Sequence, residues 1–153
     1  MTGEAWGIGV AMVGGFVGEG VPGVVADLDG SGLDAQVARL SADGGDVFGV
    51  VCDVADPDAV ARMAEQCWER HGDVQVLCNN AGVGPTGPML ATTPAAWRWT
   101  IGVNVLGVAH GVTTFAPRMV EAGVGHLVNV TSQAWWMTPA GLGMYVSFTQ
   151  TWP

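Results

Sequence analysis

The sequence predicts a doubly wound α/β domain, in which helices cover both faces of a parallel sheet. Short apolar runs rich in valine alternate with segments whose apolar residues recur at helical spacing. Hydrophobic residues make up 49% of the 153 residues and charged residues only 12%, which suits strands buried on both faces. The length is that of a single hydrophobic core, so we expect one domain over residues 1–153.

Four apolar runs are predicted to be the strands of this sheet. They span residues 22–27, 47–52, 74–78 and 126–130. The segments between them carry helix-start patterns, in which a capping residue precedes the first helical turn. Asp56–Pro57 and Thr93–Pro94 place proline at the first helical position. The second of these helices is expected to run to about Glu121.

Charge and cysteine content exclude several classes of function. The formal net charge is −9, and the five basic residues are all arginines, so we expect no binding to nucleic acid or to anionic membranes. No apolar run reaches the length of a membrane span, and no signal peptide is visible at the N-terminus. Cys52, Cys67 and Cys78 lack the spacing of a metal site. We expect them to be reduced core residues of a cytoplasmic protein that holds no metal.

A glycine-rich stretch near the N-terminus, TGEAWGIG at residues 2–9, precedes the first helical segment. Glycine allows the backbone to turn tightly and to approach a pyrophosphate closely. The helix that follows supplies amide donors and the positive end of its dipole. Such patterns are weak by themselves, and a flexible glycine-rich start is the alternative interpretation.

Asp27 ends the next predicted strand, 18 residues after Gly9, close to the spacing of about 20 residues that is typical of a ribose-binding acid. A carboxylate at this position accepts hydrogen bonds from the ribose hydroxyls of NAD. It would repel the 2′-phosphate of NADP, and no arginine lies nearby in the sequence to offset this. NAD is therefore expected rather than NADP, although solvated aspartates are also common at strand ends.

Several short motifs follow in a characteristic order. After TGEAWGIG come CDV at 52–54, NNAG at 79–82, NVLGVAHG at 104–111 and VNVTS at 128–132. With these motifs the chain resembles a classical short-chain dehydrogenase/reductase, a Rossmann-type enzyme, over nearly its whole length. The resemblance implies a cofactor site made by Thr2, Gly3, Gly7, Ile8, Gly9, Asp27, Asp53, Val54, Asn80, Ala81 and Gly82.

The resemblance also implies a catalytic group. Tyr145 would be the general acid/base for the substrate oxygen, Ser132 would hydrogen-bond that oxygen, and Asn104 would hold a water of the proton relay. The expected reaction is oxidation of a small alcohol or reduction of a ketone by hydride transfer. Without the family pattern, all three would be read as ordinary structural residues.

Position 149 departs from the family pattern, which is Tyr-x-x-x-Lys. Here the motif is Tyr145-Val-Ser-Phe-Thr149, and the chain contains no lysine. A tyrosine hydroxyl ionises near pH 10, and a neighbouring ammonium favours the phenolate. Threonine carries no charge, so this chain is expected to turn over poorly or not at all. A dinucleotide-binding protein without turnover and an unstable fragment are the alternatives.

The family pattern also implies that the domain is incomplete at both ends. The family's first strand would precede Thr2, and further elements would follow Tyr145. A broken reading frame would account for both ends, and a short, non-catalytic relative that binds NAD is the competing hypothesis.

Residues 86–90 and 139–144 are expected to form one wall of a substrate pocket, but they do not identify the substrate. The resemblance implies homo-oligomers for a full-length chain, since family members often form dimers and tetramers through the long helix that here spans about 94–121 and the helix after it.

Overall fold

The computed structural model describes residues 1–3, 5, 7–137 and 140–149, with the side chains of Trp135, Phe148 and Thr149 outside the description. The strands are β1 (Gly23–Asp27), β2 (Val47–Val51), β3 (Val76–Asn79) and β4 (His126–Asn129). The helices are α1 (Ile8–Gly18), α2 (Gly30–Ala42), α3 (Pro57–His71), α4 (Pro94–Ile101), α5 (Gly107–Ala122) and α6 (Gly143–Thr149). Three short helical turns are η1 (Met89–Ala91), η2 (Gly102–Leu106) and η3 (Gln133–Trp135).

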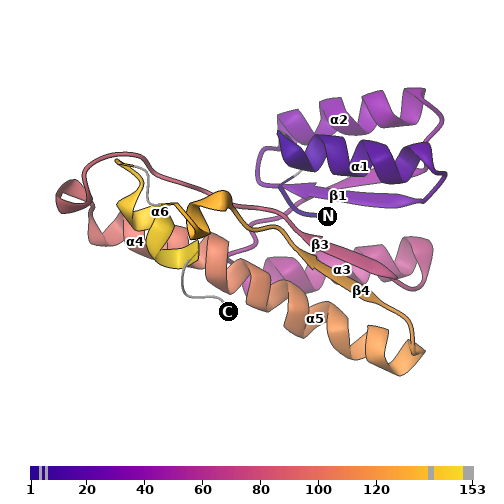
Figure 1. Cartoon of the computed structure of the whole chain (residues 1–153). Helices are drawn as coiled ribbons and strands as arrows, with labels where there is room; N and C mark the ends of the chain where they lie inside the picture. Colours follow the sequence, from indigo (N-terminus) through magenta and orange to yellow (C-terminus); the bar gives the residue numbers. More distant parts are fainter. Residues whose placement is uncertain (4, 6, 138–139, 150–153) are drawn as a thin grey trace.

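The strands lie between two layers of helices, which confirms the predicted doubly wound α/β class. β1 pairs with β2 and β3 pairs with β4, both in parallel. Figure 1 shows α1 and α2 on one side of the strands and α3 and α5 on the other. The described strands thus form two separate two-stranded parallel sheets, and ligands bind at the carboxyl ends of parallel strands in such folds.

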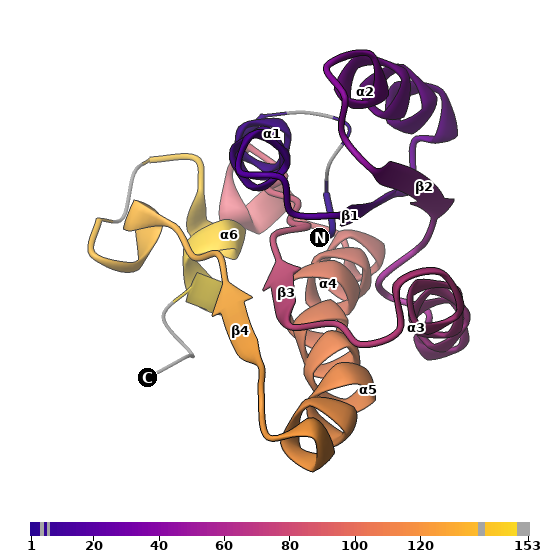
Figure 2. The same cartoon turned by 90° about the vertical axis from the view of Figure 1, so that its right-hand side faces the viewer.

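The first three residues connect the two strand pairs. Thr2 forms a parallel bridge with Ala26 of β1, and its amide donates to the carbonyl of Cys78 in β3 at 3.1 Å. Figure 2 shows the N-terminus lying between β1 and β3. The two inner strand edges are therefore held apart by a short backbone segment, and they have not closed onto each other.

The predicted helix starts are confirmed by side-chain caps. The Asp29 carboxylate accepts from the amides of Ser31 and Gly32 at the start of α2. Asp56 and Thr93 cap α3 and α4 in the same way, each just before a proline. Such caps satisfy amides that have no partner within the helix, which is why the boundaries could be predicted from short motifs.

The long helix predicted from Thr93 to about Glu121 is present, but a wider turn interrupts it. η2 has π-helical hydrogen bonding and joins α4 to α5. A methyl group added at Gly107 would lie 2.8 Å from the Val54 side chain, and one at Gly102 would lie 3.2 Å from Ala55. These glycines thus let the helix approach the loop that follows β2.

The core has one part on each side of the strands. α3 and α5 contribute Val60, Met63, Cys67, Phe115 and Met119 to one part. The other part contains Val13, Val25, Leu33, Leu40 and Val47, from α1, α2 and the first two strands. All three cysteines are buried and unbridged, as predicted for core residues.

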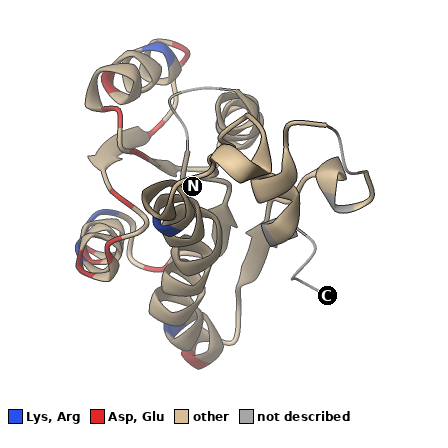
Figure 3. Cartoon of the chain, turned by 90° about the vertical axis from the view of Figure 1, so that its left-hand side faces the viewer, with Lys and Arg blue, Asp and Glu red and all other residues tan. Residues whose placement is uncertain are grey.

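Charged side chains are concentrated in one part of the molecule. Figure 3 shows acidic and basic residues along α2, α3 and α5, whereas the ribbon around α6 carries none in its described portion. The sequence after Glu121 contains no Asp, Glu, Lys or Arg. Within the described ranges, no helix combines the length and apolar character needed to cross a lipid bilayer.

Candidate functional site

A cleft of about 440 Å³ opens at the carboxyl ends of β1, β2 and β3. Most of the predicted cofactor residues line it: Gly3, Ile8, Asp27, Asp53, Val54, Asn80, Ala81 and Gly82. Thr2, Gly7 and Gly9 are the predicted residues that do not. Thr2 and Gly9 are buried, and Gly7 immediately precedes α1. The fold thus brings together motifs that lie up to about 80 positions apart in the sequence.

Thr2 and Asn80 fasten the glycine stretch to the loop after β3. The Thr2 hydroxyl accepts hydrogen bonds from the amides of Asn80 and Ala81, both at 3.1 Å. In return, the Asn80 side-chain amide donates to the carbonyls of Thr2 at 3.0 Å and Gly3 at 3.1 Å. The contacts are partly buried, so they hold one wall of the cleft against the other.

Glycine is required at two positions of this stretch by backbone conformation. Gly3 has φ +72° and Gly7 has φ +67°, values that other residues adopt only with strain. A Cβ at Gly3 would also lie 2.8 Å from the Cα of Ala81. Gly7 precedes α1 and has no side chain that could cap it. The first turn of α1 is therefore available to an anionic group.

Two carboxylates stand at the ends of β1 and β2. Asp27 accepts from the amides of Ala5 at 2.8 Å and Asp29 at 3.0 Å, so its position is held by the backbone on both sides. Asp53 accepts from the amide of Ala55 at 2.9 Å. No arginine is present among the described residues that line the cleft. The charged groups among these lining residues are thus the carboxylates of Asp27 and Asp53.

Cys52 forms part of the cleft wall between these carboxylates. Its thiol is buried, and burial together with the negative charges of Asp53 and Asp56 raises its pKa from 9.0 to about 11. The thiol is therefore neutral at physiological pH. A neutral, buried thiol is a packing group and a poor nucleophile.

Four apolar residues line the cleft that the motif analysis did not identify: Leu28, Val83, Trp99 and Val103. Leu28 is 65% exposed and Trp99 is 51% exposed, so both present apolar surface at the cleft. Leu28 could have been noticed because it directly follows the predicted strand-end aspartate. Nothing in the sequence indicated that Trp99 and Val103 line the cleft, since both fall within a helical periodicity typical of core packing.

Asn104 lies in η2 and is joined to the loop that follows β3. Its side-chain nitrogen donates to the carbonyl of Val83 at 2.8 Å, and its oxygen accepts from the amide of Val83 at 2.8 Å. Asn104 does not line the cleft itself, but Val83 does. The predicted catalytic asparagine is therefore used here to hold the rim of the cleft.

Tyr145 lies in α6 and reaches the same loop one residue further on. A Cβ added at Gly84 would be 3.1 Å from the Tyr145 ring. Ser132 precedes η3, and its hydroxyl accepts from the amide of Ala134 at 3.2 Å. η3 packs against α6, so the elements that carry Ser132 and Tyr145 are neighbours. The backbone of Thr149 ends α6, while its side chain lies outside the described residues.

The two segments expected to form a substrate-pocket wall lie side by side where they are described. The amide of Gly87 donates to the carbonyl of Gly141 at 2.8 Å. A Cβ at Gly143 would lie 3.1 Å from the sulfur of Met89. Pro139, which belongs to the predicted wall, falls outside the described residues.

The family model described as short chain dehydrogenase matches residues 1–147. Among curated relatives, 1-deoxy-11-beta-hydroxypentalenate dehydrogenase of Streptomyces arenae is 39% identical over 150 residues, covering 96% of this chain and 53% of the relative. C alpha-dehydrogenase of Sphingobium sp. is 38% identical over 147 residues, covering 95% of this chain and 48% of the relative. The chain spans about half the length of the curated relatives it matches.

Solved structures show the same likeness. A short-chain dehydrogenase/reductase from Burkholderia phymatum in complex with NAD aligns with a TM-score of 0.95 at 38% identity, over 98% of this chain and 54% of the other. A metagenomic short-chain oxidoreductase in complex with NADP aligns with a TM-score of 0.91 at 34% identity, over 97% and 67%. Both nicotinamide dinucleotides thus occur among the structural neighbours.

Proposed function

The chain belongs to the short chain dehydrogenase family, and on that basis we propose that it binds NAD and serves hydride transfer between a small alcohol and its ketone. The observation that carries the proposal is the cleft at the ends of β1, β2 and β3, which is lined by residues from each of the cofactor motifs. The dehydrogenases and oxidoreductases among its relatives support the reaction class.

The residues around the cleft fit a dinucleotide. The amides at the start of α1 would bind the pyrophosphate, since Gly7 offers no competing cap and Gly3 lets the backbone approach closely. Asn80 and Ala81 would form the wall beside the nicotinamide half. When bound, the nicotinamide would accept or supply the hydride, and the protein would supply orientation and electrostatics.

Asp27 supports NAD over NADP. Its carboxylate is fixed by the amides of Ala5 and Asp29 and would accept hydrogen bonds from an adenosine ribose. A 2′-phosphate at the same place would meet a negative charge with no arginine in the described cleft lining to offset it. We expect calorimetric titration to give at least tenfold tighter binding of NAD than of NADP, with Asp27→Ser reducing that ratio. Equal affinity for both would refute this preference.

The catalytic roles follow from Tyr145, Ser132 and Asn104. Tyr145 would take the proton from the alcohol oxygen as hydride leaves the adjacent carbon, and Ser132 would hold that oxygen by a hydrogen bond. Asn104 would act on the loop at Val83 and Gly84 and so fix the wall next to Tyr145. Tyrosine phenolate is scarce at neutral pH without a neighbouring cation, and Thr149 provides none.

Turnover is therefore proposed to be impaired, and Thr149→Lys tests this directly. NAD-linked oxidation of a panel of small secondary alcohols should be near background for the natural chain and should rise at least tenfold in Thr149→Lys. Thr149→Met, which has a long side chain without charge, should stay at background. A robust rate from the natural chain would overturn the proposal.

A binding protein without turnover is the second candidate, and the absence of any lysine from the sequence favours it. NAD binding that persists while Thr149→Lys stays inactive would support this reading. A chain that neither binds NAD nor shows a cooperative melting transition would instead be an unstable fragment.

Location and assembly form a further part of the proposal. Buried, unbridged cysteines and the acidic composition support a cytoplasmic protein that does not bind nucleic acid. Ile101 of α4 and Val120 of α5 are exposed apolar residues, which supports self-association through these two helices. Sedimentation across a range of concentrations, with Val120→Glu as the variant, would test the assembly.

A further inference from the structure

His110 joins α5 to the loop that follows β2. Its Nδ1 lies 2.9 Å from the carbonyl oxygen of Val54, which is 56 positions earlier in the sequence. A carbonyl oxygen can only accept a hydrogen bond, so Nδ1 carries the hydrogen and donates it. The contact is partly buried. Val54 lines the cofactor cleft and His110 does not, so the histidine acts on the cleft through Val54.

The same helix contacts Val54 a second time, at Gly107. A Cβ at Gly107 would lie 2.8 Å from the Val54 side chain and 3.5 Å from its carbonyl oxygen. Residues three positions apart lie on one face of a helix, so Gly107 and His110 are turned toward the same residue. Val54 is only 8% exposed. Gly107 thus gives its side chain room against the helix, while His110 binds its backbone.

Other hydrogen bonds of this loop are local or join it to β1. The Asp53 carboxylate accepts from the amide of Ala55 at 2.9 Å, which shapes the turn. The amide of Cys52 donates to the carbonyl of Asp27 at 2.9 Å, which joins the loop to the end of β1. Neither bond fixes the distance between the loop and α5. The hydrogen bond from His110 does so.

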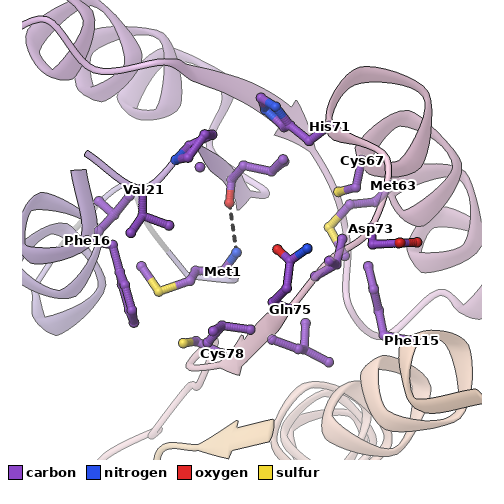
Figure 4. A pocket seen from close by; sticks show the side chains of 17 residues that line it. Met1, Phe16, Val21, Met63, Cys67, His71, Asp73, Gln75, Cys78 and Phe115 are labelled. Atoms are coloured by element: carbon purple, nitrogen blue, oxygen red, sulfur yellow. Dashed lines mark hydrogen bonds between the residues drawn. The ribbon is translucent and has the colours of Figure 1, made fainter. Parts of the chain in front are cut away.

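α5 is a firm support for this loop because its opposite end is anchored in the core. Phe115 of α5 is 2% exposed and packs with Met63 and Cys67 of α3. Figure 4 shows these three side chains on one side of a cavity of about 230 Å³ between β1 and β3. The Trp68 ring also meets the Phe115 ring edge-on, with 5.9 Å between their centroids. The helix therefore sets the position of the loop.

The strand pairing places this loop at one end of the cleft. β2 pairs with β1 so that Val51 lies opposite Asp27. Asn80 follows β3, on the other side of β1, where its amide is bound by Thr2. If Asp27 holds the adenosine ribose, as proposed above, the base would lie over the end of β2 and next to Val54. The nicotinamide half would lie toward Asn80.

We propose that His110 is a positioning residue for the adenosine half of the cofactor, an inference that rests on the proposed binding of NAD. Its Nδ1–H holds the Val54 carbonyl and so keeps residues 53 and 54 at the distance that the base requires. Without this donor, a partly buried carbonyl would lose its partner and the loop could move away from α5. Affinity for the adenosine half should then fall, although His110 touches neither cofactor nor substrate.

The test compares His110→Asn with His110→Gln by calorimetric titration of NAD and of ADP-ribose, which lacks the nicotinamide. Asparagine carries its amide nitrogen on Cγ, as histidine carries Nδ1, whereas the glutamine amide lies one bond further from the backbone. Affinity for both ligands should fall about fivefold in His110→Gln and in His110→Leu, as expected for the loss of one hydrogen bond. His110→Asn should keep the affinity of the natural chain, which a role in packing alone would not predict.

Gly107→Ala moves the same residue from the side of the helix. Its Cβ would push the Val54 side chain, so affinity for both ligands should fall as in His110→Gln. Gly18→Ala is the matched control, because it also lies in a helix and nothing lies within 4 Å of its added Cβ. It should leave both affinities unchanged.

Hydrogen exchange without ligand gives a second readout, since the amides of residues 53–55 should exchange faster in His110→Leu than in the natural chain. If the natural chain binds NAD and His110→Gln binds it equally tightly, the role of His110 is refuted while the proposed cofactor stands. An equal loss of affinity in His110→Asn and His110→Gln would also refute it, because the donor would then not matter. If the natural chain binds neither ligand, the proposed function fails and this inference fails with it.

Discussion

Asn104 and Val83 exchange two hydrogen bonds, each 2.8 Å long, between a side-chain amide and a backbone amide. This pair links the π-helical turn η2 to the loop after β3. Val83 lines the cleft, and Gly84 lies next to the Tyr145 ring, so one asparagine side chain fixes the loop that runs from the cleft to Tyr145.

Asn104→Leu should lower the free energy of unfolding by about 2 kcal/mol, because it leaves both polar groups of Val83 without their partner. Urea denaturation followed by circular dichroism measures this. Gln36→Leu is the control: Gln36 also accepts a side-chain hydrogen bond, but at the surface of α2, and its loss should cost less than about 0.5 kcal/mol. If Asn104→Leu also lowered the free energy of unfolding by less than about 0.5 kcal/mol, the hydrogen bonds between Asn104 and Val83 would not be what holds the loop.

Gly3→Ala should weaken NAD binding at least tenfold, because a Cβ at this position would lie 2.8 Å from the Cα of Ala81 and force the cleft wall to move. Gly44→Ala separates this contact from backbone strain. Gly44 also has positive φ, +89°, but nothing lies within 4 Å of its added Cβ. Gly44→Ala should lose about 1 kcal/mol of stability and keep its NAD affinity, whereas Gly3→Ala should lose more stability because of the added contact with Ala81 and should also lose NAD affinity in a calorimetric titration. Parallel losses of affinity would contradict this interpretation.

Gly84→Ala should displace the ring of Tyr145, which lies 3.1 Å from the added Cβ. Tyr145 is the only tyrosine in the chain, so selective ¹³C labelling of tyrosine gives a single ring signal in NMR spectra. That signal should shift in Gly84→Ala. Gly82→Ala, whose Cβ would approach no atom closer than 3.7 Å, should leave it in place. An unchanged signal in both variants would mean that the loop and α6 are not in contact.

The buried thiol of Cys52 should make stability depend on pH above 9. Burial, with Asp53 and Asp56 nearby, raises its pKa from 9.0 to about 11 in the folded chain. A raised pKa stabilises the fold below the unfolded value, and this contribution is lost as pH rises through the folded value. Its full size is of the order of 2 kcal/mol. The free energy of unfolding, measured from pH 8 to 10.5, should therefore fall more steeply in the natural chain than in Cys52→Ala. Parallel curves would refute the prediction.

Local signals predicted most of the elements and the position of the cofactor cleft. Asp56–Pro57 and Thr93–Pro94 mark helix starts because a cap satisfies amides within the same turn. Asp27 could be predicted to lie at the cleft because it follows an apolar run, and carboxyl ends of parallel strands meet at one edge. These properties depend on neighbours within a few residues, which the sequence alone contains.

Other features depend on contacts between distant segments, and only the fold specifies them. The double hydrogen bond of Asn104 with Val83, the contact of Gly84 with Tyr145 and the place of Leu28 and Trp99 on the cleft wall leave no periodic or motif signal. The cavity of about 230 Å³ between β1 and β3 is of the same kind. Its walls come from β1 and β3, which are separated in the sequence by two helices and a strand. The segment from Met1 to Gly3 forms hydrogen bonds with both strands and so separates those two edges.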